Sequence, residues 1–198
     1  YRDKFARTGL RAKDVPELAP YLIDMHSLIH SSPKKFLAEG AQGYWLDIDF
    51  GDYPYVTSSN TGVGAVLNNG FNYRQVWNVI GVIKCYSTYV GAKGYQKDDD
   101  RFEQLREIGQ EYGATTGRPR QIDWLNLDEV IKACQMNGVT KLIINKMDVL
   151  RQVDCAWNFY KDNILISCSD EDIFVSIIKK EFGKVLPGTL IEFQGQLH

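Results

Sequence analysis

The sequence has no long hydrophobic run and no excess of positive charge. Its most apolar stretches, residues 76–83 and 142–144, fall far short of the roughly 18 to 20 apolar residues that a membrane-spanning helix needs. Lys and Arg number 23 against 25 Asp and Glu, so the formal net charge is −2 and no broad basic surface is expected. Nucleic acids and membranes are therefore not expected partners, and any anion site must be local.

Closely spaced cysteine pairs are also absent. The four cysteines are far apart in the chain: Cys85, Cys134, Cys155 and Cys168. This spacing favours reduced thiols in a cytoplasmic protein over a disulfide framework or a zinc site. No secretory signal is visible, but the chain opens on Tyr1 without an initiator Met, so a start that is not seen here could hold one.

Two pairs of residues could in principle bind a metal or act as acid and base, but each lacks the further residues that such a site needs. His26 and His30 are four residues apart, but no third ligand or acidic base follows at a characteristic spacing, so a packing or hydrogen-bonding role is favoured. Asp47 and Asp49 are equally weak evidence for acid–base catalysis. We expect no metal-ligating residues in this chain.

The composition that remains is that of an ordinary globular domain, with 44% hydrophobic and 24% charged residues among 198. Periodicity and end signals predict helices at residues 15–29, 72–83, 101–112, 127–137 and 170–182. β-prone runs predict strands at residues 35–39, 84–90, 141–145, 163–168 and 190–193. Residues 53–64, rich in Gly, hydroxyl and amide groups, are typical of a functional loop.

Local signals mark the ends of two of these helices. Asn126 is a candidate N-cap with Glu129 three residues later, and Gly138 suits the C-terminal cap. Gly183 is expected to close the helix that begins at Asp170. Helices alternating with continuous apolar strands such as residues 141–145 predict an α/β fold with a mainly parallel central sheet flanked by helices.

One loop concentrates groups that bind anions. Residues 113–120 (GATTGRPR) combine two glycines, two hydroxyls and the guanidinium groups of Arg118 and Arg120, with Pro119 stiffening the chain between them. Glycine lets backbone N–H groups approach an anion, and arginine offers a forked donor set for a carboxylate or a phosphate. A clamp for a small anion and an ordinary solvated turn both fit this composition.

A second motif follows the predicted strand 141–145. Asn145, Lys146 and Asp148 have the N/T-K-x-D pattern with which many nucleotide-binding proteins recognise guanine. Asp148 would accept hydrogen bonds from the ring N–H and the exocyclic amine, while the stem of Lys146 lies along the base. The alternative is an ordinary solvated strand end, although strand ends are where ligands lie in open α/β sheets.

Taken together, these segments resemble the adenylosuccinate synthetase family. The matching blocks are YRDKFARTGLR (1–11), EGAQGYWLDIDFGDYPYVTSSNTG (39–62), KCYSTYVGA (84–92), EYGATTGRPR (111–120) and NKMDVL (145–150). They extend across about the first three quarters of the chain, and the final quarter matches poorly. The resemblance implies a fold related to the P-loop NTPases, of which residues 1–198 would be the central and C-terminal part of a single domain whose N-terminal part is missing.

The resemblance implies a carbon–nitrogen ligase that joins L-aspartate to the 6-position of a purine nucleotide. A nucleoside triphosphate, ATP or GTP, would first phosphorylate the 6-oxygen, with Mg²⁺ as cofactor, and aspartate would displace the phosphate. The implied catalytic residue is Gln42, which would stabilise the 6-phosphoryl intermediate. The catalytic base, the catalytic acid and the phosphate loop have no counterpart in this chain, so the 198 residues alone are expected to be inactive.

The implied binding residues fall into three groups. The purine monophosphate would be bound by Arg7, Gln42, Thr57, Val90 and Arg118, with Arg7 reaching across a homodimer. Aspartate would be bound by Ala114, Thr115, Thr116, Gly117, Arg118 and Arg120. The nucleoside triphosphate would be bound by Arg120, Asn145, Lys146 and Asp148.

The deletions after Thr61 and beyond Leu150 resemble the compact bacteriophage branch of the family, which acts on dGMP and can use ATP. We therefore expect the phage-like reaction, in the cytoplasm of the host, with the cellular reaction of IMP, GTP and aspartate as the alternative. A GTP-binding regulatory protein, suggested by Asn145–Asp148 alone, and a catalytically inactive binding domain are further hypotheses.

Overall fold

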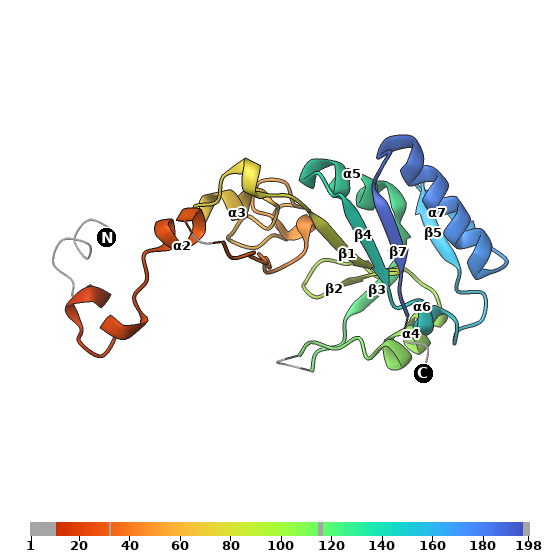
Figure 1. Ribbon diagram of the computed structural model, residues 1–198. Coiled ribbons are helices and arrows are strands. Elements are labelled where there is room, and N and C mark those ends of the chain that lie inside the picture. Colours follow the sequence, from red (N-terminus) through yellow and green to blue (C-terminus); the bar gives the residue numbers. More distant parts are fainter. Residues whose placement is uncertain (1–10, 32, 115–116, 196–198) are drawn as a thin grey trace.

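The computed structural model describes residues 11–31, 33–114 and 117–195. A main body of two sheets and their helices carries an N-terminal arm, residues 11–31, that extends away from it (Figure 1). The arm meets the body through α2 (Met25–Ser31), where His30 Nε2 lies 3.0 Å from the carbonyl oxygen of Gly70 and Ile29 is buried. His26 and His30 thus serve packing and hydrogen bonding, with their rings 4.8 Å apart.

Three parallel strands form the first sheet. They are β1 (Ile80–Lys84), β4 (Lys141–Asn145) and β7 (Leu190–Phe193), in the order β1-β4-β7. The bounds predicted for β4 and β7 are confirmed. The register places Lys84 beside Asn145, so two polar residues meet at the carboxyl end of this sheet.

The second sheet has four strands and mixed directions. They are β2 (Tyr86–Tyr89), β3 (Gln121–Asn126), β5 (Asn158–Lys161) and β6 (Ile164–Ser167). Strand β3 pairs parallel with β5, whereas β2–β3 and β5–β6 are antiparallel. The sequence predicted β6 but neither β3 nor β5. The expected strand 84–90 is corrected, because β1 ends at Lys84 and the chain then crosses to the other sheet.

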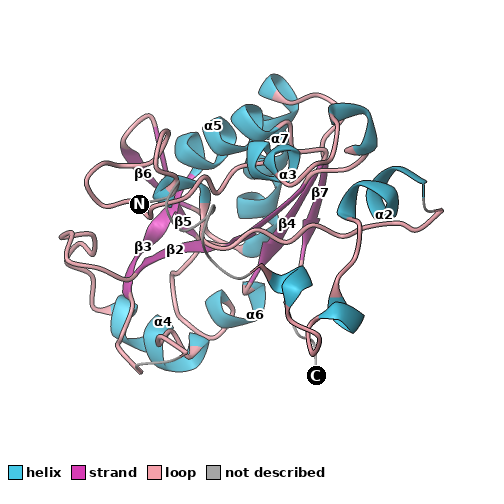
Figure 2. Cartoon of the chain, turned by 90° about the vertical axis from the view of Figure 1, so that its left-hand side faces the viewer, coloured by secondary structure: helices cyan, strands magenta, loops and turns pink. Residues whose placement is uncertain are grey.

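Helices cover these strands from two sides, as Figure 2 shows, with α5 and α7 on one side and α4 and α6 on the other. Their bounds are α3 (Gly64–Asn68), α4 (Arg101–Gly109), α5 (Leu127–Asn137), α6 (Met147–Leu150) and α7 (Glu171–Val185). The described residues also form short 3-10 turns at Ala12–Asp14, Ala19–Tyr21, Tyr44–Leu46 and Tyr73–Gln75. The α/β fold class is confirmed.

The caps of α5 are those that the sequence predicts. The Asn126 side chain accepts a hydrogen bond of 3.2 Å from the backbone N–H of Glu129, and Gly138 adopts φ 61°, which glycine tolerates without a Cβ clash. The Asp170 side chain caps α7 in the same way, through the N–H of Ile173. Gly183 is not a cap, because α7 continues through it to Val185.

Three sequence predictions in the N-terminal half are wrong. The helix expected at residues 15–29 is one 3-10 turn, Ala19–Tyr21, followed by the short α2, because Pro16 and Pro20 interrupt the α-helical hydrogen bonds. Residues 35–39 are exposed and form no strand. The helix expected at 72–83 is one 3-10 turn followed by β1, where the apolar residues pair with β4 and bury one face instead.

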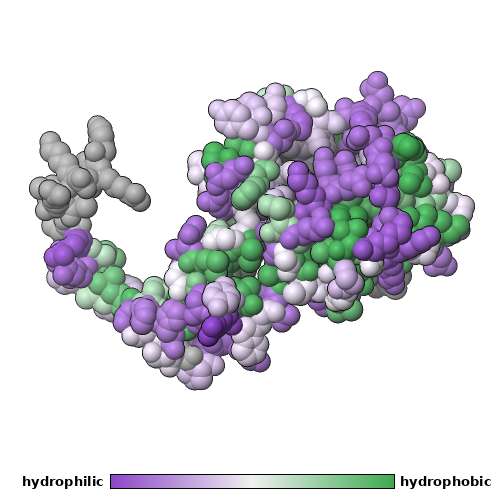
Figure 3. Space-filling view, turned by 90° about the horizontal axis from the view of Figure 1, so that it is seen from above, coloured by the Kyte–Doolittle hydropathy of each residue, from purple (hydrophilic) through white to green (hydrophobic). Residues whose placement is uncertain are grey.

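Large apolar side chains from both sheets and from α4, α5 and α7 form a single core. Its largest fully buried members include Trp124, Tyr86, Phe102, Phe159, Phe174 and Phe182. The β1–β4–β7 sheet keeps a second face on which Ile80, Val82 and Leu190 are 50%, 61% and 56% exposed. Figure 3 shows further apolar surface in patches over the body and along the arm. In the part of the chain that the structure describes, no helix is long and apolar enough to cross a membrane.

Candidate functional site

Residues 112–114 and 117–120, around and within the GATTGRPR segment, pair as the two arms of a hairpin between α4 and β3. Tyr112 and Pro119 form an isolated antiparallel bridge, and the N–H of Gly113 donates to the carbonyl oxygen of Arg118 at 2.9 Å. Gly117 turns the chain back with φ 63°, a conformation that glycine adopts freely. Ala114, Gly117 and Arg118 are exposed on these arms, whereas Arg120 is only partly exposed.

Arg120 leaves the hairpin and turns inward. Its N–H donates to the carbonyl oxygen of Glu111 at 2.9 Å, and its Nη1 donates to Oε2 of Glu111 at 3.1 Å. Its own carbonyl oxygen accepts from Nε of Arg106 at 2.9 Å. The Nε atom of Arg120 is buried and has no partner among the described residues. Backbone and side chain together therefore fix where this guanidinium lies.

Glu111 is the buried carboxylate of the site, with a side chain that is 2% exposed. Lys84 Nζ donates to its Oε2 at 2.6 Å, and the Tyr86 hydroxyl donates to its Oε1 at 2.8 Å. Burial lowers the pKa of Lys84, and the charges of Arg120 and Lys146 lower it further, while Glu111 opposes the change. Burial and the charge of Glu111 raise the pKa of Tyr86, so its hydroxyl stays a donor.

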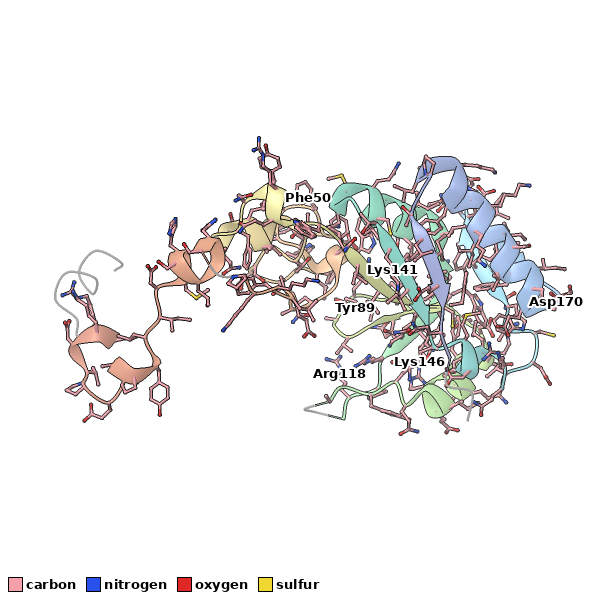
Figure 4. The ribbon with its side chains drawn as sticks, in the orientation of Figure 1. Phe50, Tyr89, Arg118, Lys141, Lys146 and Asp170 are labelled. Atoms are coloured by element: carbon pink, nitrogen blue, oxygen red, sulfur yellow. The ribbon has the colours of Figure 1, made fainter. Side chains whose placement is uncertain are left out.

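The predicted base-recognition strand end lies beside this carboxylate. Lys146 follows β4 with a left-handed backbone, φ 69°, and its Nζ donates to the carbonyl oxygen of Gly109 at the end of α4, at 3.0 Å. The carbonyl oxygen of Asn145 accepts from the N–H of Cys85 at 2.9 Å, and Asp148 lies in α6. Figure 4 shows Arg118 and Lys146 at the same, lower end of the sheet. The fold thus brings the two sequence motifs together.

Gln42 and Thr57 lie on a different part of the body, the loop that surrounds the 3-10 turn Tyr44–Leu46. Gln42 has φ 74°, a left-handed backbone that is rare for a residue with a side chain. The N–H of Thr57 donates to the carbonyl oxygen of Leu46 at 2.8 Å, which fixes the loop backbone next to its side chain. Strained backbone of this kind is often found at functional sites.

Asp47 organises that loop from inside and is not an acid–base partner of Asp49. Its side chain accepts from the N–H groups of Thr61, Asp49 and Phe50, at 2.6, 2.9 and 3.1 Å. Burial opposes ionisation of Asp47, but these hydrogen bonds outweigh it and lower its pKa. Asp49 accepts instead from Asn60 Nδ2 at 2.6 Å.

Contacts with α5 and with the segment after β2 attach the loop to the rest of the body. Oδ1 of Asn137, the last residue of α5, accepts from the N–H of Val63 at 2.8 Å. Lys93 pairs with Asp52 and so ties the loop to the segment after β2, where Val90 is 46% exposed. The predicted residues Arg7, Thr115 and Thr116 lie outside the described residues.

Sequence reasoning missed Lys84, Tyr86, Glu111 and the role of Asp47. The first three lie inside the quoted blocks KCYSTYVGA and EYGATTGRPR, so position within a block was the available signal. Among the described residues, no group of three or more His, Cys, Asp and Glu side chains is placed to hold a metal ion. The buried carboxylate of Glu111 already accepts from three donors, so it offers no ligand for Mg²⁺.

Comparison with known proteins assigns this arrangement to a family. A profile described as adenylosuccinate synthetase matches residues 11–156. The chain belongs to the adenylosuccinate synthetase family. The chloroplastic adenylosuccinate synthetase of Ostreococcus tauri is 45% identical over 152 residues, covering 73% of this chain and 32% of that protein. The enzyme of Leuconostoc citreum is 45% identical over 140 residues, covering 68% and 33%.

Solved structures agree on the fold. The fully ligated adenylosuccinate synthetase of Plasmodium falciparum has a TM-score of 0.64 and 33% identity, over 85% of this chain and 44% of that one. The cyanophage S-2L succinoaminodeoxyadenylate synthetase, bound to dGMP and dATP, has a TM-score of 0.54 but only 19% identity, over 91% and 68%, and shows the fold alone. The chain spans about a third of the length of these curated relatives. The comparisons therefore favour the cellular branch over the phage branch that the deletions suggested.

Proposed function

We propose that this chain is part of a cellular-type adenylosuccinate synthetase, which condenses L-aspartate with the 6-position of IMP at the expense of GTP. The observation that supports this most directly is that the fold brings Arg118, Arg120 and the strand end Asn145–Asp148 to one end of the sheet. An anion clamp beside a guanine-recognition motif suits a reaction that joins a triphosphate, a monophosphate and a dicarboxylate.

The proposed roles follow from the family resemblance, residue by residue. Arg118, with Ala114, Thr115, Thr116 and Gly117, binds aspartate, and Arg118 also reaches the nucleotide. Arg120 lies between aspartate and the triphosphate, whose base is held by Asn145, Lys146 and Asp148. Gln42, Thr57 and Val90, with Arg7 of the other subunit, bind the purine monophosphate, and Gln42 stabilises the phosphorylated purine. The cationic groups of this set stabilise negative charge on the transferred phosphoryl group.

We further propose that residues 1–198 are the central and C-terminal part of a larger single domain. The matched segment covers only about a third of each relative, and Ile80, Val82 and Leu190 are exposed on the second face of the β1–β4–β7 sheet. Parallel sheets are normally covered on both faces. The remainder of the fold would cover this second face and supply the phosphate loop and the acid and base.

Mg²⁺, a homodimer and a cytoplasmic location remain predictions. The described residues contain no carboxylate cluster for Mg²⁺, so no step is assigned to it through this chain. The relative from Ostreococcus tauri is named as chloroplastic. Neither its name nor that of the Plasmodium falciparum structure specifies a dimer.

The test is phosphate release by the whole protein supplied with IMP, GTP, aspartate and Mg²⁺. We expect release that depends on all three substrates and falls strongly when dGMP replaces IMP. Higher activity with dGMP and ATP would support the phage-like reaction instead. GTP binding that is indifferent to IMP and aspartate would support a regulatory protein.

Arg118→Ala separates a ligase from an inactive binding domain. We expect it to weaken aspartate binding and to lower phosphate release by about ten- to hundredfold, because a hydrogen bond between two charged groups is lost. Arg74→Ala, at an exposed arginine of the 3-10 turn Tyr73–Gln75, is the matched control and should change neither. Unchanged ligand binding by Arg118→Ala would contradict the clamp.

A further inference from the structure

Glu111 lies beneath the anion clamp and links three segments of the chain. Lys84 at the end of β1 and Tyr86 at the start of β2 donate to its two carboxylate oxygens. Arg120, at the start of the path into β3, donates to Oε2, the same oxygen that Lys84 uses. The carboxylate is thus anchored by Lys84 and Tyr86 on one side and contacts Arg120 on the other.

This arrangement restricts Arg120 more than solvent would. Its backbone is already held by Glu111 and Arg106, and its Nη1 is held by the buried carboxylate, while its side chain remains 32% exposed. A long arginine side chain loses much rotamer freedom when it is ordered, so a clamp that is ordered before its ligand arrives binds more tightly. The Glu111 carboxylate therefore bears part of the entropic cost of ligand binding.

The charges also leave Arg120 able to attract an anion. Lys84 and Arg120 contact the Glu111 carboxylate and the charge of Lys146 acts on Lys84, while Asp148 follows in α6, so positive charge exceeds negative charge among these groups. If Glu111 served only to neutralise the buried ammonium of Lys84, the Arg120 contact would be incidental. The shared Oε2 atom instead makes the position of the guanidinium depend on the same carboxylate.

We propose that Glu111 is a positioning residue for Arg120: its buried carboxylate orients the guanidinium that receives the carboxylate of aspartate and the triphosphate. The inference rests on the proposed function, since that function assigns these ligands to Arg120. It predicts that loss of the Glu111 charge weakens the ligands of Arg120 and leaves the purine monophosphate, which Arg120 does not contact, unaffected.

The experiment measures the dissociation constants of GTP, L-aspartate and IMP for the whole protein by calorimetry. Glu111→Gln keeps the size of the side chain but removes the charge, and we expect GTP and aspartate to bind about ten- to hundredfold more weakly. The constant for IMP should change by less than about twofold. Glu107→Gln, at an exposed glutamate on the same helix α4, is the control and should bind all three as the unaltered protein does.

A double-mutant cycle separates positioning from a general structural role. In the Arg120→Ala background, Glu111→Gln should add less than about a twofold further loss, because the group that it positions is gone. The proposal would be overturned if the two single-variant losses of affinity multiplied in full in the double variant. It would also be overturned if a folded Glu111→Gln variant had unchanged dissociation constants. Should Glu111→Gln fail to fold, Glu111→Asp keeps the charge but withdraws it from Arg120 by one methylene, and the same outcomes apply.

A readout without ligand keeps this inference distinct from the proposed function. If the unaltered protein binds none of the three ligands, the proposed function fails, and the position of Arg120 is read from its side-chain Nε–Hε NMR signal, assigned by its loss in Arg120→Ala. We expect that signal to move in Glu111→Gln and to stay in Glu107→Gln. A signal that stays in both variants would overturn the positioning role.

Discussion

Replacement of Asp47 by Asn tests whether one buried carboxylate organises the loop that carries Thr57. Asp47 is 1% exposed, and its Oδ1 accepts the N–H groups of Asp49 and Phe50 while its Oδ2 accepts that of Thr61. Asn keeps one oxygen and can hold the first pair. Its amide NH₂ would then face the N–H of Thr61 at the position of the shortest bond, where two donors oppose each other.

The expected cost follows from these three bonds. One buried N–H loses its acceptor, which costs about 1–3 kcal/mol, and two bonds to a charged group become bonds to a neutral one. We expect a total of about 2–4 kcal/mol at neutral pH, expressed first as opening of residues 47–62. Amide hydrogen exchange reports this directly at Ile48 and Thr57, whose own backbone bonds, to Ser59 and Leu46, do not involve Asp47. Both should exchange about 30- to 1000-fold faster.

The pH dependence gives an independent check. Because hydrogen bonds to its carboxylate lower the pKa of Asp47 in the folded protein, its contribution is complete above the ordinary value of 3.8 and is lost as pH falls through the folded value. The difference between the two proteins should therefore shrink only below about pH 4. Equal exchange at neutral pH, or a difference that persists unchanged into acid, would refute this reasoning. Asp49→Asn, at an exposed carboxylate, is the control.

Further predictions concern glycines and thiols. Gly183→Ala should raise the free energy of unfolding by about 0.5–1 kcal/mol, because Gly183 lies inside α7 with open space around a new Cβ, whereas Gly138→Ala should lower it by about 1 kcal/mol at φ 61°. Urea unfolding measures both changes in the free energy of unfolding. Changes of the same sign would contradict the placement of Gly183 inside α7 and of Gly138 at the end of α5. In the native protein at pH 8, the exposed Cys155 should react first with a thiol reagent. Cys134, whose pKa burial raises to about 11, should react only on unfolding, and a fast reaction there would show that this part of the core opens.

Much of the C-terminal half could be predicted from the sequence because its signals are local. A run of five residues gave the bounds of β4, and the side chains of Asn126 and Gly138 mark the ends of α5 by contacts within one turn. Gly183 misled because a glycine in a helix costs only about 1 kcal/mol relative to alanine, and the packing of α7 outweighs that.

The N-terminal half was harder because its order comes from distant contacts. Residues 72–83 have helical spacing, but the apolar residues of β1 pair with a strand some sixty residues later, and that pairing decides their structure. The sequence assigned Asp47 no role, since no local pattern shows that the N–H of Thr61, fourteen residues on, is its partner. Glu111 likewise gave no signal of its own, because Lys84 reaches it across 27 residues.

Under the proposed function, a chain with a net charge of −2 would hold anions through local positive charge. Positive charge is not spread over the surface but gathered where two carboxyl-terminal strand ends, a helix end and a hairpin meet. Cations so close together repel one another, and the pKa of Lys84 is lowered first by its burial and further by this repulsion. One buried carboxylate reduces the repulsion without cancelling the charge. Removing the Glu111 carboxylate would therefore increase the net positive charge of the site and yet weaken anion binding. The reason is that the ordered position of the Arg120 side chain contributes more to anion affinity than one further unit of positive charge does.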